Sequence, residues 1–124
     1  MRRILVAEDD PALRALYRLW LEHAGYVVVD VPDGGAALDL LEQGPLPDAA
    51  VLDVDMPRVD GIAVCRYLHA RAPGIPVVMA TGMDGMAGEA LAAGTASLLP
   101  KPFDGDELLT ALAEAAPLLL RRAS

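Results

Sequence analysis

Acidic residues that directly follow apolar runs are the side chains of this sequence best placed to do chemistry. Asp53 ends the run that begins at Val51, and Glu8 and Asp9 follow the run Ile4–Ala7. An apolar run that ends in a carboxylate is typical of a buried strand that delivers an acid to the edge of a sheet. An acid at such a position can also simply begin a turn, so Asp53 by itself does not decide between a structural and a chemical role.

These acids would repel one another if they met at one sheet edge. Without compensation, at least one of Glu8, Asp9 and Asp53 would be driven toward its protonated form, and a bound divalent cation would remove that conflict. Oxygen ligands with room for water favour Mg²⁺, which also binds phosphate oxygens. Lys101 could supply a positive charge and Thr81 a hydroxyl donor for the other oxygens of a phosphoryl group during in-line transfer.

Five strands alternating with five helices would bring these residues together. We predict strands at 4–7, 27–31, 49–53, 76–81 and 97–100, and helices at about 11–24, 36–43, 62–71, 84–93 and from 106 onward. This alternation predicts a doubly wound parallel α/β sheet, in which the carboxyl ends of the strands share one edge and bind ligands there. Asp53 is the expected nucleophile because its strand should lie between the other two contributing positions. Pro100 is tolerable mainly at a sheet edge, so the last strand should be an outer one.

Several local expectations accompany this fold. The first helix should bury one apolar face, on which the two aromatic residues pack rather than bind a ligand; this face comprises Leu13, Leu16, Tyr17, Trp20, Leu21 and Ala24. Residues 32–35, with sequence Pro-Asp-Gly-Gly, should form a turn before the second helix. The single cysteine, Cys65, cannot form an internal disulfide and should be buried.

Composition limits the class of protein. With 124 residues, of which 54% are hydrophobic, the chain suits one domain over residues 1–124. A formal charge of -8 disfavours binding to a phosphate backbone, so nucleic acid is not an expected direct partner. The longest stretch without a charge, 72–83, is too short to span a membrane, and the N-terminus lacks a signal-peptide pattern. We therefore expect a cytoplasmic domain, either standing alone or cut from a longer protein.

Four motifs in this order give the chain its resemblance to the receiver domain of bacterial two-component response regulators. They are Ile4–Pro11, Val51–Pro57 with Asp60-Gly61, Ala80–Gly82 and Lys101–Phe103. The resemblance covers essentially the whole chain, and it rests on the four motifs together because each is weak alone. It implies a flavodoxin-like sheet of five parallel strands in the order 2-1-3-4-5, with five helices.

The resemblance also implies a role for each acid. Asp53 would accept a phosphoryl group from a phosphohistidine on a sensor histidine kinase or a phosphotransfer protein. Asp9 and Asp53 would bind Mg²⁺ together with the backbone carbonyl of Asp55, and Glu8 would act through a water molecule. The domain would then be a signalling module that catalyses only its own phosphorylation and dephosphorylation.

The same resemblance assigns Thr81 and Lys101 to the phosphoryl group. Both would contact the acyl phosphate, and the Lys101–Pro102 peptide bond would be cis, as X-Pro bonds can be. The charge of about -1.5 to -2 that phosphorylation adds would draw both residues inward and reshape the neighbouring loops. Such a switch would control a partner or an output.

Three features depart from the pattern of the family. Leu98 stands where many receivers carry a Tyr or Phe that acts as a rotamer switch. The interval from Thr81 to Lys101 is shorter than usual, which shortens the fourth helix. Glu8 replaces the more common Asp but keeps the charge. A homodimer through the fourth helix, fifth strand and fifth helix would be the family's usual assembly, although the first two departures weaken that expectation.

Two other functions remain open on the sequence. A haloacid-dehalogenase-type phosphatase also uses an Asp-x-Asp pair, which residues 53–55 would match, but in that family the last acidic pair follows the lysine, and this chain has no room for a cap domain. A degenerate receiver that binds partners without phosphorylation is the second alternative. The complete set of acids, Thr81 and Lys101 argues against it.

Overall fold

A single parallel sheet forms the centre of the molecule. The computed structural model describes residues 2–56, 59–82, 93–95 and 97–115. The strands are β1 (Arg3–Ala7), β2 (Val27–Val31), β3 (Ala49–Asp53), β4 (Val77–Thr81) and β5 (Ser97–Pro100). Their order across the sheet is β2-β1-β3-β4-β5, and every neighbouring pair is parallel. The predicted sheet and its order are confirmed, and Pro100 lies in an edge strand as expected.

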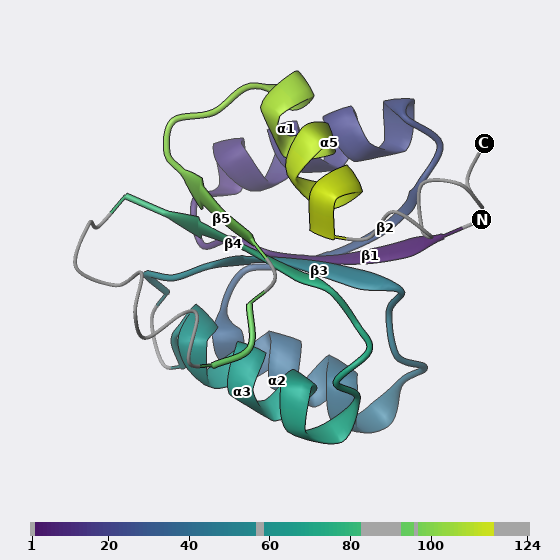
Figure 1. The fold of residues 1–124 in the computed structure, drawn as a ribbon. Helices are drawn as coiled ribbons and strands as arrows, with labels where there is room; N and C mark the ends of the chain where they lie inside the picture. Colours follow the sequence, from purple (N-terminus) through teal and green to yellow (C-terminus); the bar gives the residue numbers. More distant parts are fainter. Residues whose placement is uncertain (1, 57–58, 83–92, 96, 116–124) are drawn as a thin grey trace.

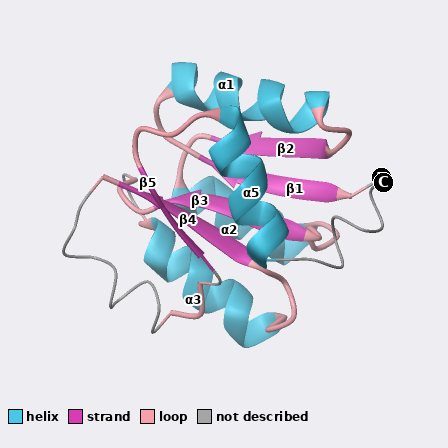
Figure 2. Ribbon diagram, turned by 45° about the horizontal axis from the view of Figure 1, so that its top comes forward, coloured by secondary structure: helices cyan, strands magenta, loops and turns pink. Residues whose placement is uncertain are grey.

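Helices cover both faces of this sheet. The described residues contain α1 (Pro11–His23), α2 (Gly34–Gln43), α3 (Gly61–Arg71) and α5 (Gly105–Ala115). Figure 1 shows α1 and α5 on one face of the sheet and α2 and α3 on the other, and Figure 2 shows the same layers from a second direction. Four of the five predicted helices are therefore observed. The remaining one, the fourth in chain order, was predicted at 84–93 and lies outside the described residues except for Ala93.

The alternation of side chains along each strand divides the core into two layers. In β1, Leu5 and Ala7 belong to the layer under α2 and α3, whereas Ile4 and Val6 belong to the layer under α1 and α5. Successive side chains of a strand point to opposite faces, so a strand covered on both faces must be apolar at every position. β3 meets this condition, since all five of its residues are buried.

Aspartate side chains set the starts of the helices. Asp10, Asp33 and Asp60 each cap a helix by accepting hydrogen bonds from backbone N–H groups in its first turn. The turn predicted at residues 32–35 is wrong in its second half, because Asp33 accepts from the Ala36 N–H at 2.8 Å and the helix already begins at Gly34. The cap, rather than the two glycines, decides where α2 starts.

The buried face of α1 is narrower than predicted. Tyr17 and Leu21 are buried, but Leu16 is 37% exposed and Leu19 is 62% exposed. Tyr17 and Leu21 lie four residues apart and so share a face, whereas Leu16 is rotated by about 100° from Tyr17. The assignment of Leu16 to the core is therefore wrong, and so is that of Ala24, which is exposed at the end of the helix.

The single cysteine lies on the buried face of α3. Cys65 is buried and free, as predicted. In α3, Ile62 and Leu68 point into the core beside it. None of the helices in the described part of the chain has the length and apolar character needed to cross a membrane.

Candidate functional site

The alternation of side chains along the strands directs three charged residues to the same face of the sheet, at its carboxyl edge. Glu8 continues the series of Ile4 and Val6, which pack in the layer under α1 and α5. Asp53 continues the series of Val51 in β3, and Lys101 continues that of Leu99 in β5; Val51 and Leu99 belong to the same layer. Because side chains repeat every two residues along a strand, these three should project to the same face, next to α1 and α5.

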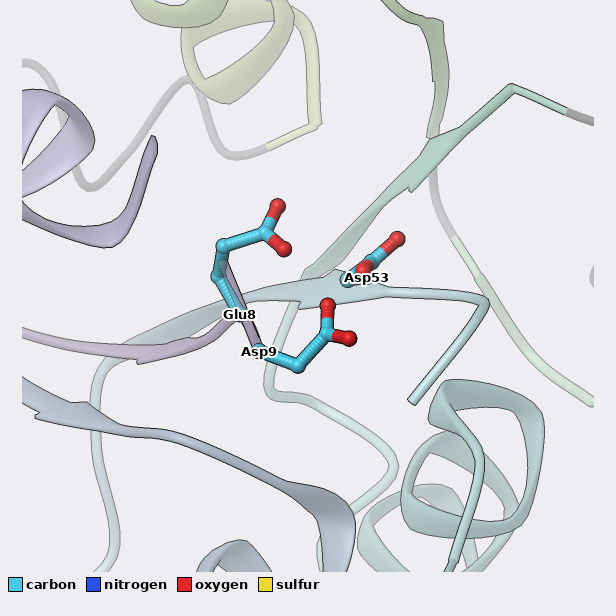
Figure 3. A group of neighbouring side chains, drawn as sticks. All are labelled: Glu8, Asp9 and Asp53. Atoms are coloured by element: carbon cyan, nitrogen blue, oxygen red, sulfur yellow. The ribbon is translucent and has the colours of Figure 1, made fainter. Parts of the chain in front are cut away.

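Three carboxylates meet at this edge, as predicted. One oxygen from each of Glu8, Asp9 and Asp53 lies within 4.8 Å of the other two, and Figure 3 shows the three side chains converging at the ends of β1 and β3. Glu8 is 1% exposed and Asp53 is 3% exposed, while Asp9 is open to solvent. Two buried acids and one exposed acid form an oxygen donor set with a side that faces water, which fits Mg²⁺ better than a fully enclosing protein cage.

Lys101 bridges two of the acids. Its Nζ lies 2.9 Å from Glu8 Oε1 and 3.0 Å from Asp53 Oδ1. One lysine cannot neutralise three carboxylates, so the side chains of Glu8, Asp9, Asp53 and Lys101 together carry an excess of negative charge. The backbone adds further donors, since the Asp10 N–H donates to Glu8 Oε2 at 3.2 Å and the Asp55 N–H donates to Asp53 Oδ1 at 3.4 Å.

The electrostatics of the cluster follow from this geometry. Burial raises the pKa of Asp53 to about 7, opposed by the hydrogen bond from Lys101 and reinforced by the charge of Glu8. Burial alone would lower the pKa of Lys101, but hydrogen bonds to Glu8 and Asp53 outweigh it and the pKa is raised. Burial acts to raise the pKa of Asp9, but its hydrogen bonds with Glu8 and Asp53 outweigh this effect, and the pKa is lowered. Burial therefore destabilises the charged form of Asp53, whereas the charged form of Asp9 is stabilised.

Thr81 and Asp55 stand at the same edge. Thr81 ends β4, is paired in register with Pro100, and its carbonyl accepts a hydrogen bond from the Lys101 N–H at 2.8 Å. Asp55 is exposed two residues beyond the end of β3. The Lys101–Pro102 peptide bond is cis, as expected. Leu98, at the position of the family's aromatic switch, is partly buried beside the α2 and α3 layer.

Sequence reasoning missed two residues of α1 that lie beside the site. Arg14 donates from Nη1 to the Glu8 carbonyl at 3.0 Å, and the ring of Tyr17 stacks on Phe103, two residues beyond Lys101. Both residues come from α1, and both were assigned to the helix without a role at the site. The available signal was their position in the first two turns after the acids, where α1 must pass close to the end of β1.

The comparison with protein families agrees with this geometry. The family described as response regulator receiver domain matches residues 4–113. The chain is 44% identical over 124 residues to the response regulator MprA of Mycobacterium sp. strain KMS, an alignment that covers 98% of this chain and 52% of that protein. It is 45% identical over 109 residues to the response regulator MprA of Mycolicibacterium vanbaalenii, covering 86% and 47%.

Solved structures show the same fold. A CheY-like response regulator receiver domain protein from Methanospirillum hungatei superposes with a TM-score of 0.87 at 26% identity, covering 99% of this chain and 96% of that one. The receiver domain of the Francisella response regulator 1452 gives a TM-score of 0.84 at 28% identity, with complete coverage of both chains. The present chain spans about half the length of the curated relatives it matches.

Proposed function

The chain belongs to the response regulator receiver domain family, and on this basis we propose that Asp53 accepts a phosphoryl group from a phosphohistidine on a sensor histidine kinase or a phosphotransfer protein. A carboxylate oxygen of Asp53 attacks phosphorus in line with the phosphorus–nitrogen bond. The new oxygen–phosphorus bond forms as that bond breaks, and its electron pair returns to the imidazole nitrogen. The product is an aspartyl phosphate, which later reacts with water.

The other residues of the site act on the phosphoryl oxygens. Lys101, already 3.0 Å from Asp53, would move its charge to an oxygen of the incoming group. Thr81 lies at the end of the adjacent strand, where its hydroxyl could donate to a second oxygen. In this proposal the domain catalyses only its own phosphorylation and dephosphorylation.

A Mg²⁺ ion fits the donor set at the sheet edge. Asp9, Asp53 and the backbone carbonyl of Asp55 would hold the ion, and Glu8 would act through a water molecule. The ion would supply positive charge to the phosphoryl oxygens as they approach Asp53. The observation that supports this assignment is the convergence of three carboxylates, two of them buried, around Lys101, which is within salt-bridge distance of Glu8 and Asp53.

The single observation that carries the proposed function is the environment of Asp53. It is 3% exposed at the tip of β3, between β1 and β4, yet it lies within reach of Lys101 and of the exposed acid Asp9. An acid with only a structural role in starting a turn has no need of a partly buried lysine shared with a second acid. A nucleophile that must meet a phosphoryl group needs such a lysine, because the lysine can pair with the charge of that group.

Incubation with Mg²⁺ and acetyl phosphate tests the proposal. Intact-mass measurement should show one phosphoryl adduct on the unaltered protein and none on Asp53→Asn. Asp39→Asn, an exposed position on α2 away from the sheet edge, is the matched control and should be phosphorylated normally. Absence of an adduct on the unaltered protein would favour a degenerate receiver, whereas many turnovers of a phosphate ester would favour a phosphatase.

The kinase partner, a location in the cytoplasm and a homodimer are further parts of the proposal. The surface formed by the fourth helix, β5 and α5 would be the homodimer contact, but residues 83–92, which include most of the predicted fourth helix, lie outside the described part of the chain. Size-exclusion chromatography with light scattering, before and after phosphorylation, measures whether such a dimer forms.

A further inference from the structure

Arg14, near the start of α1, connects three elements beside the acidic cluster. Its Nη1 donates to the backbone carbonyl of Glu8, just after β1, at 3.0 Å, and its Nε lies 3.4 Å from Asp30 Oδ2 in β2. Its own backbone N–H donates to the Asp10 carbonyl at 2.9 Å, in the pattern of a helix. The side chains of Arg14 and Asp30 are only 22% and 21% exposed, so water competes with this pair less than with a fully exposed one.

The contact falls on the peptide group that precedes Asp9. β1 ends at Ala7, and the Glu8 N–H still donates to the Val31 carbonyl of β2 at 3.1 Å. The Glu8 carbonyl belongs to the same planar unit as the Asp9 N–H, because the peptide bond does not rotate freely. A donor that fixes this carbonyl therefore fixes the plane from which the backbone of Asp9 continues.

Asp9 depends on its backbone for its direction more than the two buried acids do. Glu8 and Asp53 are almost completely buried, and Lys101 Nζ lies 2.9 Å and 3.0 Å from their carboxylates. Asp9 is exposed, so packing restrains its side chain less. One of its oxygens nevertheless lies within 4.8 Å of those of the other two acids, and Figure 3 shows its carboxylate beside that of Asp53.

An arginine suits this position because it presents several donors in one rigid plane. Arg14 uses one nitrogen for the Glu8 carbonyl and another for Asp30, so the ion pair holds the guanidinium where it meets the carbonyl. A hydrogen bond from a charged donor is roughly twice as strong as one between neutral groups. Because this bond is made to the backbone, it leaves the carboxylate oxygens of Glu8 to their other partners.

We propose that Arg14 is a positioning residue of the acidic site: its guanidinium, anchored on Asp30, fixes the peptide between Glu8 and Asp9 and thereby the direction of the Asp9 carboxylate. The role rests on the proposed function, in which Asp9 binds Mg²⁺. Arg14 itself touches neither the ion nor the phosphoryl group.

The charge of Arg14 and its position predict opposite effects when it is removed. A positive charge close to the acids repels a second cation, so charge alone predicts that Arg14→Gln binds Mg²⁺ more tightly. Loss of the bond to the Glu8 carbonyl predicts weaker binding, because Asp9 is then no longer held in the orientation that the ion requires. The direction of the change therefore distinguishes the two effects.

Arg18 provides a matched control on the same helix. It lies one turn after Arg14 and also pairs with Asp30, and its Nε lies 3.2 Å from Glu22 Oε2. Arg18→Gln therefore removes the same charge and a pair with the same acid, but it retains the donor to the Glu8 carbonyl. A role of Arg14 limited to joining α1 to β2 predicts that the two substitutions behave alike.

Calorimetric titration with Mg²⁺ and the backbone amide NMR spectrum of the metal-free protein separate these roles. Arg14→Gln should weaken Mg²⁺ affinity by about tenfold and shift the amide resonance of Asp9, whose peptide group loses its hydrogen bond. Arg18→Gln should change the affinity by less than about twofold and leave that resonance in place. Arg14→Lys keeps the charge, but its single ammonium cannot serve both partners from separate nitrogens, so it should weaken the affinity by about three- to fivefold.

Three results would overturn the role of Arg14: an Mg²⁺ affinity of Arg14→Gln that equals or exceeds that of the unaltered protein, equal losses in Arg14→Gln and Arg18→Gln, or an Asp9 amide resonance that Arg14→Gln leaves unchanged. Thermal unfolding of each variant checks that the fold is retained, and Arg14→Lys carries the comparison if Arg14→Gln does not fold. If the unaltered protein takes up no phosphoryl group from acetyl phosphate, the proposed function fails, and the Mg²⁺ titrations and the Asp9 resonance still decide whether Arg14 positions Asp9.

Discussion

The sharing of one lysine between two buried acids governs the chemistry of the site at the residue scale. Lys101 lies about equally close to Glu8 and Asp53, so within the described part of the chain the two acids share this cation. Asp53 is consequently a buried carboxylate whose ionised form is stabilised only in part. Such a group is poised to bind a cation or a phosphoryl group, because either would resolve its electrostatic conflict.

Asp53→Asn should therefore stabilise the metal-free protein, increasingly so as the pH rises. The pKa of Asp53 is raised to about 7 from an ordinary value of 3.8, so the folded state holds a proton that the unfolded chain releases. Stability consequently falls between about pH 4 and pH 7 and then levels off. Removing the charge should raise the free energy of unfolding by about 1–3 kcal/mol at pH 8 and by less at pH 5.

Urea unfolding in the presence of a chelator, at pH 5 and pH 8, measures this difference. Asp39→Asn removes a carboxylate from an exposed position and is the control for the change in net charge. An advantage of Asp53→Asn that is no larger at pH 8 than at pH 5 would contradict the electrostatic account of Asp53.

Helix α3 fixes the position of the strand tip at the scale of elements. Gly61 begins this helix directly against β3, and its N–H donates to the Val54 carbonyl at 3.1 Å. A Cβ atom at Gly61 would lie 2.0 Å from the Asp53 carbonyl oxygen, a distance that requires the backbone to move. The helix can approach the end of β3 this closely only because the residue at the contact has no side chain.

Gly61→Ala should thus disturb both the fold and the site. Overpacking against backbone at this contact should lower the free energy of unfolding by about 2 kcal/mol or more and displace Asp53. Denaturant unfolding and the rate of phosphorylation by acetyl phosphate report the two effects. Gly74→Ala is the matched control, because a Cβ there meets nothing within 4 Å. Equal behaviour of the two variants would show that the close contact does not constrain Asp53.

The elements themselves were largely predictable, for identifiable reasons. β2, β3 and β5 begin and end where the sequence predicted, because each is a short apolar run between turn or charged residues. The start of α2 was not predicted correctly, because the capping side chain of Asp33 places two glycines inside the helix. Leu16 was misplaced because α1 presents only a narrow face to the sheet, and helical spacing alone does not show which of several apolar positions contact the core.

The clustering of the candidate site residues was predictable because all strands of a parallel sheet end at one edge. This rule identified Glu8, Asp9, Asp53, Thr81 and Lys101, each of which lies at or directly after the end of its strand. It could not identify the stack of Tyr17 on Phe103, which depends on how α1 packs against a segment remote in the sequence. Contacts between side chains of different layers are fixed by packing, which strand position does not encode.

At the scale of the whole molecule, the site joins parts of the chain that are remote in sequence. The segment that carries Asp9 is separated from the segment that carries Asp53 and Asp55 by α1, β2 and α2. Lys101 follows β5, which is the edge strand on the other side of the sheet from β2. The unfolded chain cannot hold these groups together. Any ion that binds them together consequently binds the folded state in preference to the unfolded one.

Mg²⁺ should therefore stabilise the folded domain, and a chelator should reverse the effect. At a concentration 100 times Kd, binding to the folded state alone adds about 2.7 kcal/mol, which corresponds to a rise in Tm on the order of 10 °C for a domain of this size.

The net charge of -8 offers a competing cause of stabilisation, because any cation screens repulsion among acids. Thermal unfolding in Mg²⁺ and in NaCl of equal ionic strength distinguishes the two, since screening depends on ionic strength whereas binding depends on the ion. Asp9→Asn removes the exposed acid proposed to bind the ion and leaves the core intact, so it should lose the Mg²⁺ effect and keep the NaCl effect, while Asp39→Asn should keep both. An equal response of Asp9→Asn and Asp39→Asn to Mg²⁺ would assign the stabilisation to the charge of the whole surface rather than to the three converging carboxylates.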